Sequence, residues 1–366
     1  EACQREVSNV SMSSAHSGSM HSLGADTLGA DKHFPGRTPH IDAEDADSSC
    51  PIPPSMHNLA GFTDFDLIGE GRVTKVYAAK HRNDDKLVAI KAYCRACLGD
   101  AELGKVWNQL NVVQAIDHPH IINIHSALIE KDTLFIVEEY AERGDLWSRL
   151  TMAPENKLVE ADLMVKVVVP LLKALQHLAH FGIVHRDVKP ENLLFVRDKQ
   201  STPATPMAST SGRLVLSDFR FSINKNVKLP MARLGTLEYM APEVLAVFLG
   251  AADVDKELLA PGPKSPGGHT HRLVDEGVRE MAYDEKVDVW AVGCVVYEAL
   301  FGITPFVSPT DKETASKIMW GTPDYPPGGS EEAVAFLERV FVKRPEDRPS
   351  ASELLNDPLV AKYCSH

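Results

Sequence analysis

The sequence predicts an α+β protein with two lobes, and three observations lead to this prediction. Short runs with alternating apolar residues begin near Phe65 and continue to Tyr140, which is typical of β-strands. From Asp145 onward, apolar residues recur at intervals of three and four, which is typical of helices. Residues 1–60 show neither period. We therefore expect a small sheet followed by a larger, mostly helical part.

Residues 1–60 are rich in Ser, His, Gly, Asp and Pro, and their apolar residues are isolated. Such a segment buries too little surface to offset the entropy lost on ordering, so we expect a disordered, low-complexity tail. One globular domain is expected at residues 61–362, with surface insertions at about residues 198–212 and 250–282, which are rich in Ser, Thr, Pro or Gly. The chain begins with Glu1 rather than methionine, so we expect a fragment whose true start and any targeting peptide are not visible.

The first lobe, at about residues 61–141, has the pattern of a small sheet with one main helix. One stretch, residues 101–115, has helical spacing. Alternation and β-branched content predict strands at residues 65–69, 74–80, 87–93, 121–128 and 133–140.

The second lobe, at about residues 142–362, is expected to be mostly α-helical. Helical spacing is clearest at residues 160–181. The most apolar run, residues 289–300, contains Glu298 and is shorter than the roughly 18 residues that a membrane span needs. We therefore expect a buried core helix there and no membrane span.

The 366-residue chain is 44% apolar and 24% charged, which is ordinary for a globular protein with a sizeable core. Its formal net charge of −13 argues against a nucleic-acid partner and against binding to anionic membranes, because both are negative. The same charge is compatible with basic peptide substrates, and equally with an acidic surface that only keeps the protein in solution.

The six cysteines are too sparse and irregular for the disulfide framework of a small secreted domain. This favours a reducing, intracellular compartment, either cytoplasmic or nuclear. Cys94 and Cys97 have C-x-x-C spacing, but no second pair or nearby histidine offers the other two ligands of a zinc site. We expect the pair to be structural or incidental, with a redox role as the alternative.

Glycines and a lysine in the first lobe indicate a phosphate-binding loop. A predicted strand runs into Gly69, Glu70 and Gly71 and resumes at Val76. Glycines let backbone amides approach phosphate oxygens that a side chain would block, although two glycines also occur in ordinary hairpins. Lys91 follows an apolar strand segment, so we expect its ammonium group to point inward.

The strongest signal is the segment HRDVKPENLL at residues 185–194, followed later by Asp218 and Phe219. Phosphoryl transfer needs a carboxylate that orients the attacking hydroxyl, a cation on the moving phosphate and oxygen ligands for Mg²⁺. These groups are supplied, in that order, by Asp187, Lys189, Asn192 and Asp218.

With these motifs the sequence resembles the eukaryotic protein kinase family over about residues 65–362. The resemblance implies a bilobal protein-kinase-like fold with an antiparallel sheet in its first lobe, and ATP with Mg²⁺ as cofactors. It implies that Asp187, Lys189 and Asn192 are catalytic and that Asn192 and Asp218 bind the metal. The resemblance assigns ATP binding to Gly69, Glu70, Gly71, Val76, Ala89, Lys91, Glu139, Ala141, Asp145, Leu194 and Asp218.

Further motifs indicate which subgroup of the kinase family the sequence resembles. Lys189 and the segment GTLEY at residues 235–239 resemble serine/threonine kinases, most of all the Aurora group, and Thr236 would then help to orient Asp187. Glu191 resembles the acidic residue with which basophilic kinases read an arginine, so protein substrates with basic residues near the acceptor are expected. The resemblance also implies that Glu243, Asp288, Trp290 and Arg348 brace the helical lobe, with Arg348 paired to Glu243.

Two substitutions alter the predicted phosphate and metal loops. Thr74 replaces the third glycine of the phosphate loop, which adds a Cβ without removing a backbone amide. Arg220 replaces the glycine that follows Asp218 and Phe219 in the family pattern, which removes backbone freedom from that segment.

Two further substitutions affect the partner of Lys91 and the adenine pocket, respectively. The helix position that holds its glutamate partner in the family falls on Gln109, or on Glu102 in another register. The amide oxygen of Gln109 could still accept a bond from the ammonium group, and even losing the whole hydrogen bond would slow turnover by about 10- to 100-fold, which attenuates activity without abolishing it. Glu138 occupies a position behind the adenine that is usually apolar or threonine. Because an unpaired buried carboxylate is costly, we expect it to have a partner or an outward rotamer.

The activation segment has no hydroxyl group at the positions where activating phosphorylation is expected. Met231 and Ala232 occupy the positions of the phosphorylated threonines of Aurora-like kinases, and residues 228–234 contain no Ser, Thr or Tyr. Arg186 therefore lacks its usual phosphate partner. We expect an enzyme of constitutively low activity, or one that an activating protein partner switches on.

Two classes of function remain open. The first is an attenuated but active kinase that phosphorylates serine and threonine in proteins, because Lys91 and the four chemistry-bearing residues are present. The second is an ATP-binding pseudokinase scaffold, supported by Thr74, Gln109 and Arg220. A small-molecule kinase is disfavoured because residues 235–243 resemble a peptide-docking segment.

Overall fold

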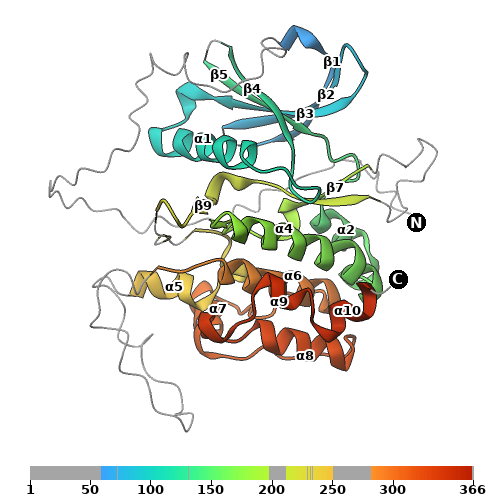
Figure 1. Cartoon of the computed structure of the whole chain (residues 1–366), viewed down its shortest axis with the longest axis vertical. Helices are drawn as coiled ribbons and strands as arrows, with labels where there is room; N and C mark the ends of the chain where they lie inside the picture. Colours follow the sequence, from blue (N-terminus) through green and yellow to red (C-terminus); the bar gives the residue numbers. More distant parts are fainter. Residues whose placement is uncertain are drawn as a thin grey trace, which may run out of the picture. The chain divides into compact units, whose positions relative to one another are not determined.

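The computed structural model of the chain describes residues 59–71, 73–130, 132–197, 212–228, 230, 232, 234–249 and 282–364. The predicted tail and the two predicted insertions lie outside the described residues, apart from their last one or two positions (Figure 1). The fold divides into two compact units. The first contains residues up to Gly99 together with His125–Glu138, and the second contains Asp100–Ile124 and residues from Glu139 onward.

The first unit is a five-stranded sheet with the strand order β1-β2-β3-β5-β4. Strands β1 and β2, and β2 and β3, pair in antiparallel fashion, which confirms the predicted antiparallel sheet. A buried cluster covers one face, and it includes Phe62, Ala79, Val88, Ile90, Leu128 and Val137. The strands are β1 (Phe62–Glu70), β2 (Thr74–His81), β3 (Leu87–Cys94), β4 (Ile124–Glu130) and β5 (Thr133–Glu139).

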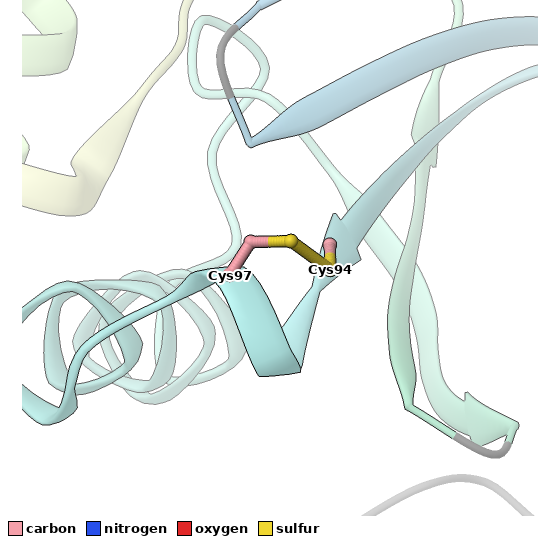
Figure 2. Close-up of a disulfide and its surroundings, with 2 residues drawn as sticks. All are labelled: Cys94 and Cys97. Carbon is pink, nitrogen blue, oxygen red and sulfur yellow. A yellow bond between two sulfur atoms is a disulfide. The ribbon is translucent and has the colours of Figure 1, made fainter.

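A disulfide between Cys94 and Cys97 joins the end of β3 to the 3₁₀ turn Arg95–Cys97 (Figure 2). The two Cα atoms are 5.3 Å apart. The Cys94 N–H also donates to the carbonyl of Val73, in the loop between β1 and β2, at 3.2 Å. The bridge was not predicted, because C-x-x-C spacing allows a local disulfide without requiring one. It stiffens the strand end that borders the predicted phosphate loop.

The second unit is mostly helical, as predicted, with two small two-stranded sheets. The sheets pair β6 (Ile183–Val184) with β9 (Ile223–Asn224) and β7 (Leu193–Val196) with β8 (Arg213–Leu216). The helices are α1 (Asp100–Gln114), α2 (Leu146–Met152), α3 (Glu160–Leu163), α4 (Val169–His180), α5 (Pro242–Leu249), α6 (Lys286–Phe301), α7 (Asp311–Trp320), α8 (Glu331–Val340), α9 (Ala351–Leu354) and α10 (Pro358–Cys364).

Helix α6 is the centre of the second unit and contacts both α4 and α8 (Figure 1). Almost all of its side chains are buried, which confirms the core helix predicted at residues 289–300. Trp290 stacks on Phe306, with 5.2 Å between ring centroids, and meets Phe341 edge-on. This aromatic cluster anchors the helix that carries Asp288.

A helical run extends over Glu160–His180, as predicted for residues 160–181. Within it, Met164–Val168 form a π-helical turn just before Pro170. Proline has no N–H to donate to the carbonyl four residues earlier, which explains the wider turn. Among the described residues, this run alone is long and apolar enough to cross a membrane, but most of it is buried inside the protein, as in a core helix.

Helix α1 occupies almost the residues predicted for it, and two of its side chains contact the segment that follows Asp218. Asn108 Nδ2 donates to the Ser222 carbonyl at 2.7 Å, and Lys105 lies over the Phe221 ring at 5.3 Å. These contacts explain why α1 groups with the helical unit, whereas the sequence pattern placed it on the sheet.

Candidate active site

The predicted phosphate loop is a tight hairpin between β1 and β2. The Gly71 N–H donates to the Thr74 carbonyl at 2.7 Å and closes the turn, while Gly69 pairs with Val76 across the two strands. A Cβ added to Gly71 would meet Thr74 O at 3.7 Å, an ordinary contact. Packing in the hairpin therefore does not require glycine at position 71, which is consistent with a role in leaving room for a ligand. Thr74 is accommodated as the first residue of β2.

Three predicted nucleotide contacts share one face of the sheet. Val76 on β2 lies opposite Lys91 on β3, and Ala89 precedes Lys91 by two positions on the same strand. Because side chains alternate along a strand and opposite residues share a face, the three side chains are neighbours.

The ammonium group of Lys91 forms an ion pair with the carboxylate of Glu138, on β5, with Nζ and Oε1 2.7 Å apart. The side chains are 18% and 3% exposed, respectively. This confirms the expectation that Glu138 has a partner, since a buried carboxylate without a counter-charge is strongly disfavoured.

The sequence analysis offered two positions on helix α1, Gln109 and Glu102, for the partner of Lys91. Gln109 is fully buried on α1, and neither atom of its amide has a hydrogen-bond partner among the described residues. Glu102, the alternative from another register, pairs with Lys105 one turn along the same helix, at 2.6 Å. Its carboxylate is therefore engaged within α1.

The predicted catalytic loop runs from β6 through the 3₁₀ turn Pro190–Asn192 into β7. Asn192 Nδ2 donates to the backbone carbonyl of Asp187 at 2.7 Å and to its Oδ2 at 2.9 Å. Lys189 Nζ lies 3.3 Å from the same Oδ2 and donates to Thr236 Oγ1 at 2.9 Å. Thr236 thus reaches Asp187 through Lys189, which is the route by which it could help to orient Asp187.

Asp288 holds the backbone just before Asp187. Its two oxygens accept from the N–H groups of His185 and Arg186 at 2.7 and 2.8 Å, and Arg186 has a positive φ of 70°. Burial raises the pKa of Asp288, and these N–H donors oppose that shift. The predicted bracing role of Asp288 therefore takes the form of two bonds that fix a left-handed backbone residue.

Gly235 closes the other side of the catalytic loop. Its φ is 114°, and a Cβ there would meet the Arg186 carbonyl oxygen at 2.8 Å. Only glycine allows this close approach. Together with Thr236 and Tyr239, Gly235 lines a small pocket that also contains Asp187.

The pairing of β7 with β8 brings Asp218 to the catalytic loop. Leu193 faces Leu216, and the Ser217 N–H donates to the Asn192 carbonyl at 2.9 Å. Asn192 and Asp218 therefore flank one strand pair. Their oxygens are the hard donors that Mg²⁺ prefers, and because the Asn192 NH₂ group is used by Asp187, its Oδ1 is the atom suited to a metal.

Arg220 forms a bidentate ion pair with Asp218, which the sequence analysis did not anticipate. Nε donates to Oδ1 at 2.7 Å and Nη2 to Oδ2 at 2.6 Å, while Asp218 itself is left-handed with φ 61°. Phe219, between them, is fully buried and meets His185 edge-on at 4.7 Å. A guanidinium group thus lies on the carboxylate that is predicted to bind the metal.

The remaining predicted ATP contacts are spread over β5, α2 and β7. Glu139 pairs with Arg213, Ala141 is half-buried, and Leu194 forms a β-bridge with Asp145. Asp145 also caps α2, because its Oδ1 accepts from the Ser148 N–H at 2.6 Å. This capping role has a sequence signal, an aspartate before a helix, that the analysis did not use.

Tyr283 is a site residue that the sequence analysis missed. Arg186 Nη1 donates to its hydroxyl at 3.2 Å, and the hydroxyl donates to the Ala232 carbonyl at 2.7 Å. Burial raises the pKa of Tyr283, which keeps the hydroxyl protonated. No local motif identifies it, because it lies 97 residues from Arg186 in the sequence.

Comparisons with known proteins agree with this geometry. A family model described as protein kinase domain matches residues 62–257 and 270–360. Serine/threonine-protein kinase Nek1 of Mus musculus is 26% identical over 298 residues, covering 81% of this chain but 21% of Nek1, so the chain spans about a fifth of that relative. Aurora kinase of Encephalitozoon cuniculi is 26% identical over 301 residues, 81% of this chain and 93% of the relative. Aurora-2 of Arabidopsis thaliana is 25% identical over 307 residues, 82% and 91% of the two chains.

Proposed function

The chain belongs to the protein kinase family, of the serine/threonine type, and from this premise we propose that it transfers the terminal phosphate of ATP to hydroxyl groups of proteins. The observation that carries the proposal is the bonded cluster of Asp187, Lys189 and Asn192, with Asp218 on the adjoining strand pair. Phosphoryl transfer depends mainly on positioning and charge neutralisation, which is the chemistry that these groups offer.

Each residue has one task in this proposal. Asp187 orients the acceptor hydroxyl with its Oδ1, because Oδ2 is engaged by Asn192 and lies close to Lys189. Lys189 would bind the moving phosphate, and Asn192 Oδ1 and Asp218 would hold Mg²⁺. The bound Mg²⁺ would neutralise charge on the phosphate oxygens. Lys91, in the sheet, contacts the α- and β-phosphates.

We propose that substrates carry a basic residue near the acceptor. Glu191 is exposed and lies between the predicted base and the metal ligand Asn192 in the same loop. The pocket that Asp187 shares with Gly235, Thr236 and Tyr239 gives an acceptor side chain a place beside the carboxylate. An arginine of the substrate would form a solvent-exposed ion pair with Glu191.

We also propose that activity does not depend on phosphorylation of the activation segment. Arg186, which binds the activating phosphate in related kinases, is engaged here by neutral groups, the Tyr283 hydroxyl and the Phe221 carbonyl. Tyr283 in turn holds the Ala232 carbonyl. These contacts tie the activation segment to Arg186 without a phosphate, and an activating protein partner remains an additional route.

The test is a phosphate-transfer assay with two peptides that differ only in one upstream residue, arginine or alanine. The arginine peptide should be used about two- to fivefold better, the range of an exposed ion pair, and Glu191→Gln should abolish this preference. Pretreating the enzyme with phosphatase should leave the rate unchanged. Equal use of both peptides refutes the substrate preference, and loss of activity with a phosphate mapped to residues 219–242 refutes the proposed activation. Transfer no faster than by Asp187→Asn would favour the pseudokinase scaffold.

We propose further that the rate is attenuated by Arg220, which competes with Mg²⁺ for Asp218. Arg220→Gln should lower the Mg²⁺ concentration for half-maximal transfer by about two- to fivefold, because it removes an ion pair whose side chains are 35% and 16% exposed. A Mg²⁺ titration of the transfer rate measures this effect. Arg220→Lys retains a cation and should shift the curve less, and an unchanged curve for Arg220→Gln would show that the guanidinium group does not compete.

A further inference from the structure

The face of β5 that carries Glu138 is otherwise apolar. Ile136 and Leu134, two and four positions earlier, point to the same side of the strand and are fully buried. A carboxylate in line with such residues is disfavoured unless a counter-charge is close. Packing alone would be satisfied by an apolar residue, so the ion pair calls for another explanation.

Lys91 provides the counter-charge from the neighbouring strand. β3 and β5 are adjacent in the sheet, and Lys91 lies between Ala89 and Tyr93 on its own face, both of them buried. The pair therefore joins two strands of one sheet at 2.7 Å. Glu138 Oε2 has no hydrogen-bond partner among the described residues, so Lys91 is the described group that neutralises the carboxylate.

The two α1 positions that the sequence offered for the partner of Lys91 carry a neutral residue and a carboxylate that pairs within the helix. Gln109 is neutral, and its amide forms no hydrogen bond among the described residues. Glu102 is paired with Lys105 and its side chain is 43% exposed. The charge missing from helix α1 is therefore present in the sheet.

We propose that Glu138 is the positioning residue for Lys91, in place of a helix glutamate. The inference deepens the proposed function, since it concerns how the phosphate-binding lysine of that site is held. Glu138 would fix the position of the Lys91 ammonium group through the 2.7 Å ion pair. Because both residues belong to one sheet, the pair persists wherever helix α1 lies.

The experiment compares Glu138→Gln, which removes the charge but keeps the shape, with Glu138→Asp, which keeps the charge. Glu138→Gln should lower kcat/KM for ATP by about 10- to 100-fold, the range for losing a hydrogen bond to a charged group. Glu138→Asp should restore most of this loss. The matched control is Glu130→Gln on β4, whose carboxylate accepts from the Leu59 N–H rather than from Lys91, and it should keep the parental rate.

A binding measurement separates this inference from the proposed function, because it needs no turnover. The dissociation constant of a non-hydrolysable ATP analogue with Mg²⁺ should rise at least threefold in Glu138→Gln. In a Lys91→Met background the same substitution should have no further effect, since the residue that it positions is gone. A purely structural role would instead lower the unfolding temperature and affect both backgrounds equally.

The inference is overturned if folded Glu138→Gln keeps kcat/KM and analogue affinity within twofold of the parent, or if the affinity loss is the same with Met at position 91. Should Glu138→Gln fail to fold, Glu138→Met takes its place in both measurements, because an unbranched apolar side chain suits the apolar face of β5 and also lacks the charge. If the parent binds the analogue but transfers no phosphate, the proposed function fails while the binding comparison still tests the role of Glu138.

Discussion

Replacing Asp187 by asparagine should lower kcat by about 10²- to 10⁴-fold, the usual contribution of a general base, with little change in the KM for ATP. The amide cannot accept the proton of the attacking hydroxyl. It should nevertheless preserve the loop, because the Asn192 side chain also bonds to the backbone carbonyl of Asp187, which the substitution leaves intact. Steady-state transfer to a basic protein or peptide measures the effect.

The matched control is Asp162→Asn on helix α3. Asp162 forms a half-exposed ion pair with Lys166, one turn along the same helical run, so its loss should leave kcat unchanged. Both variants should unfold at nearly the parental temperature. If Asp187→Asn transfers phosphate as fast as the parent, Asp187 is not the base, and the interpretation of the cluster around it is wrong.

Replacing Arg348 by alanine should lower the free energy of unfolding by about 3–5 kcal/mol, because it leaves the Glu243 carboxylate without its buried counter-charge. Arg348 is fully buried and binds both oxygens of Glu243, at 2.7 and 3.0 Å. It also donates to the carbonyls of Val342 and Lys286 and packs over Trp290. The sequence analysis predicted this pair as a brace, and the structure confirms the contact.

Denaturant unfolding of the purified chain measures this loss. The control is Arg344→Ala, because Arg344 pairs with Glu346 while its side chain is 69% exposed, and the change should stay within about 0.5 kcal/mol. In the double variant Arg348→Ala, Glu243→Gln, part of the lost free energy of unfolding should be recovered, since the unpaired carboxylate of Glu243 is removed. A loss below about 1 kcal/mol in Arg348→Ala would contradict a stabilising role for the pair.

The local periodicity of the sequence was sufficient to predict most elements of the fold. Alternation located β2, β3 and β5, and helical spacing located α1 and α6 within a few residues. One strand was predicted too early: residues 121–128 were expected, but β4 begins at Ile124. Ile121 instead forms a parallel bridge with Leu216 and is buried in the second unit. An apolar run shows that a segment is buried but not which partner buries it.

The predicted site followed from motifs whose residues carry the chemistry, and the structure places Asp187, Lys189 and Asn192 in bonded contact. The sequence could not show which charged or polar side chains pair when they are far apart along the chain. Tyr283 contacts Arg186 but lies 97 residues further along the chain, so no local motif could identify it. Glu138 and Arg220 were recognised as unusual residues, but their partners became known only from the fold, because each pairing depends on side-chain direction rather than on sequence spacing.

The ion pair between Lys91 and Glu138 has a consequence for allosteric control. In many kinases an effector acts by moving a helix whose glutamate must meet the lysine, so helix position and catalysis share a coupling free energy. Here both partners belong to the same sheet. An effector that shifts α1 should therefore have little effect on the position of Lys91. We expect inhibitors or activators of this enzyme to act through the activation segment instead.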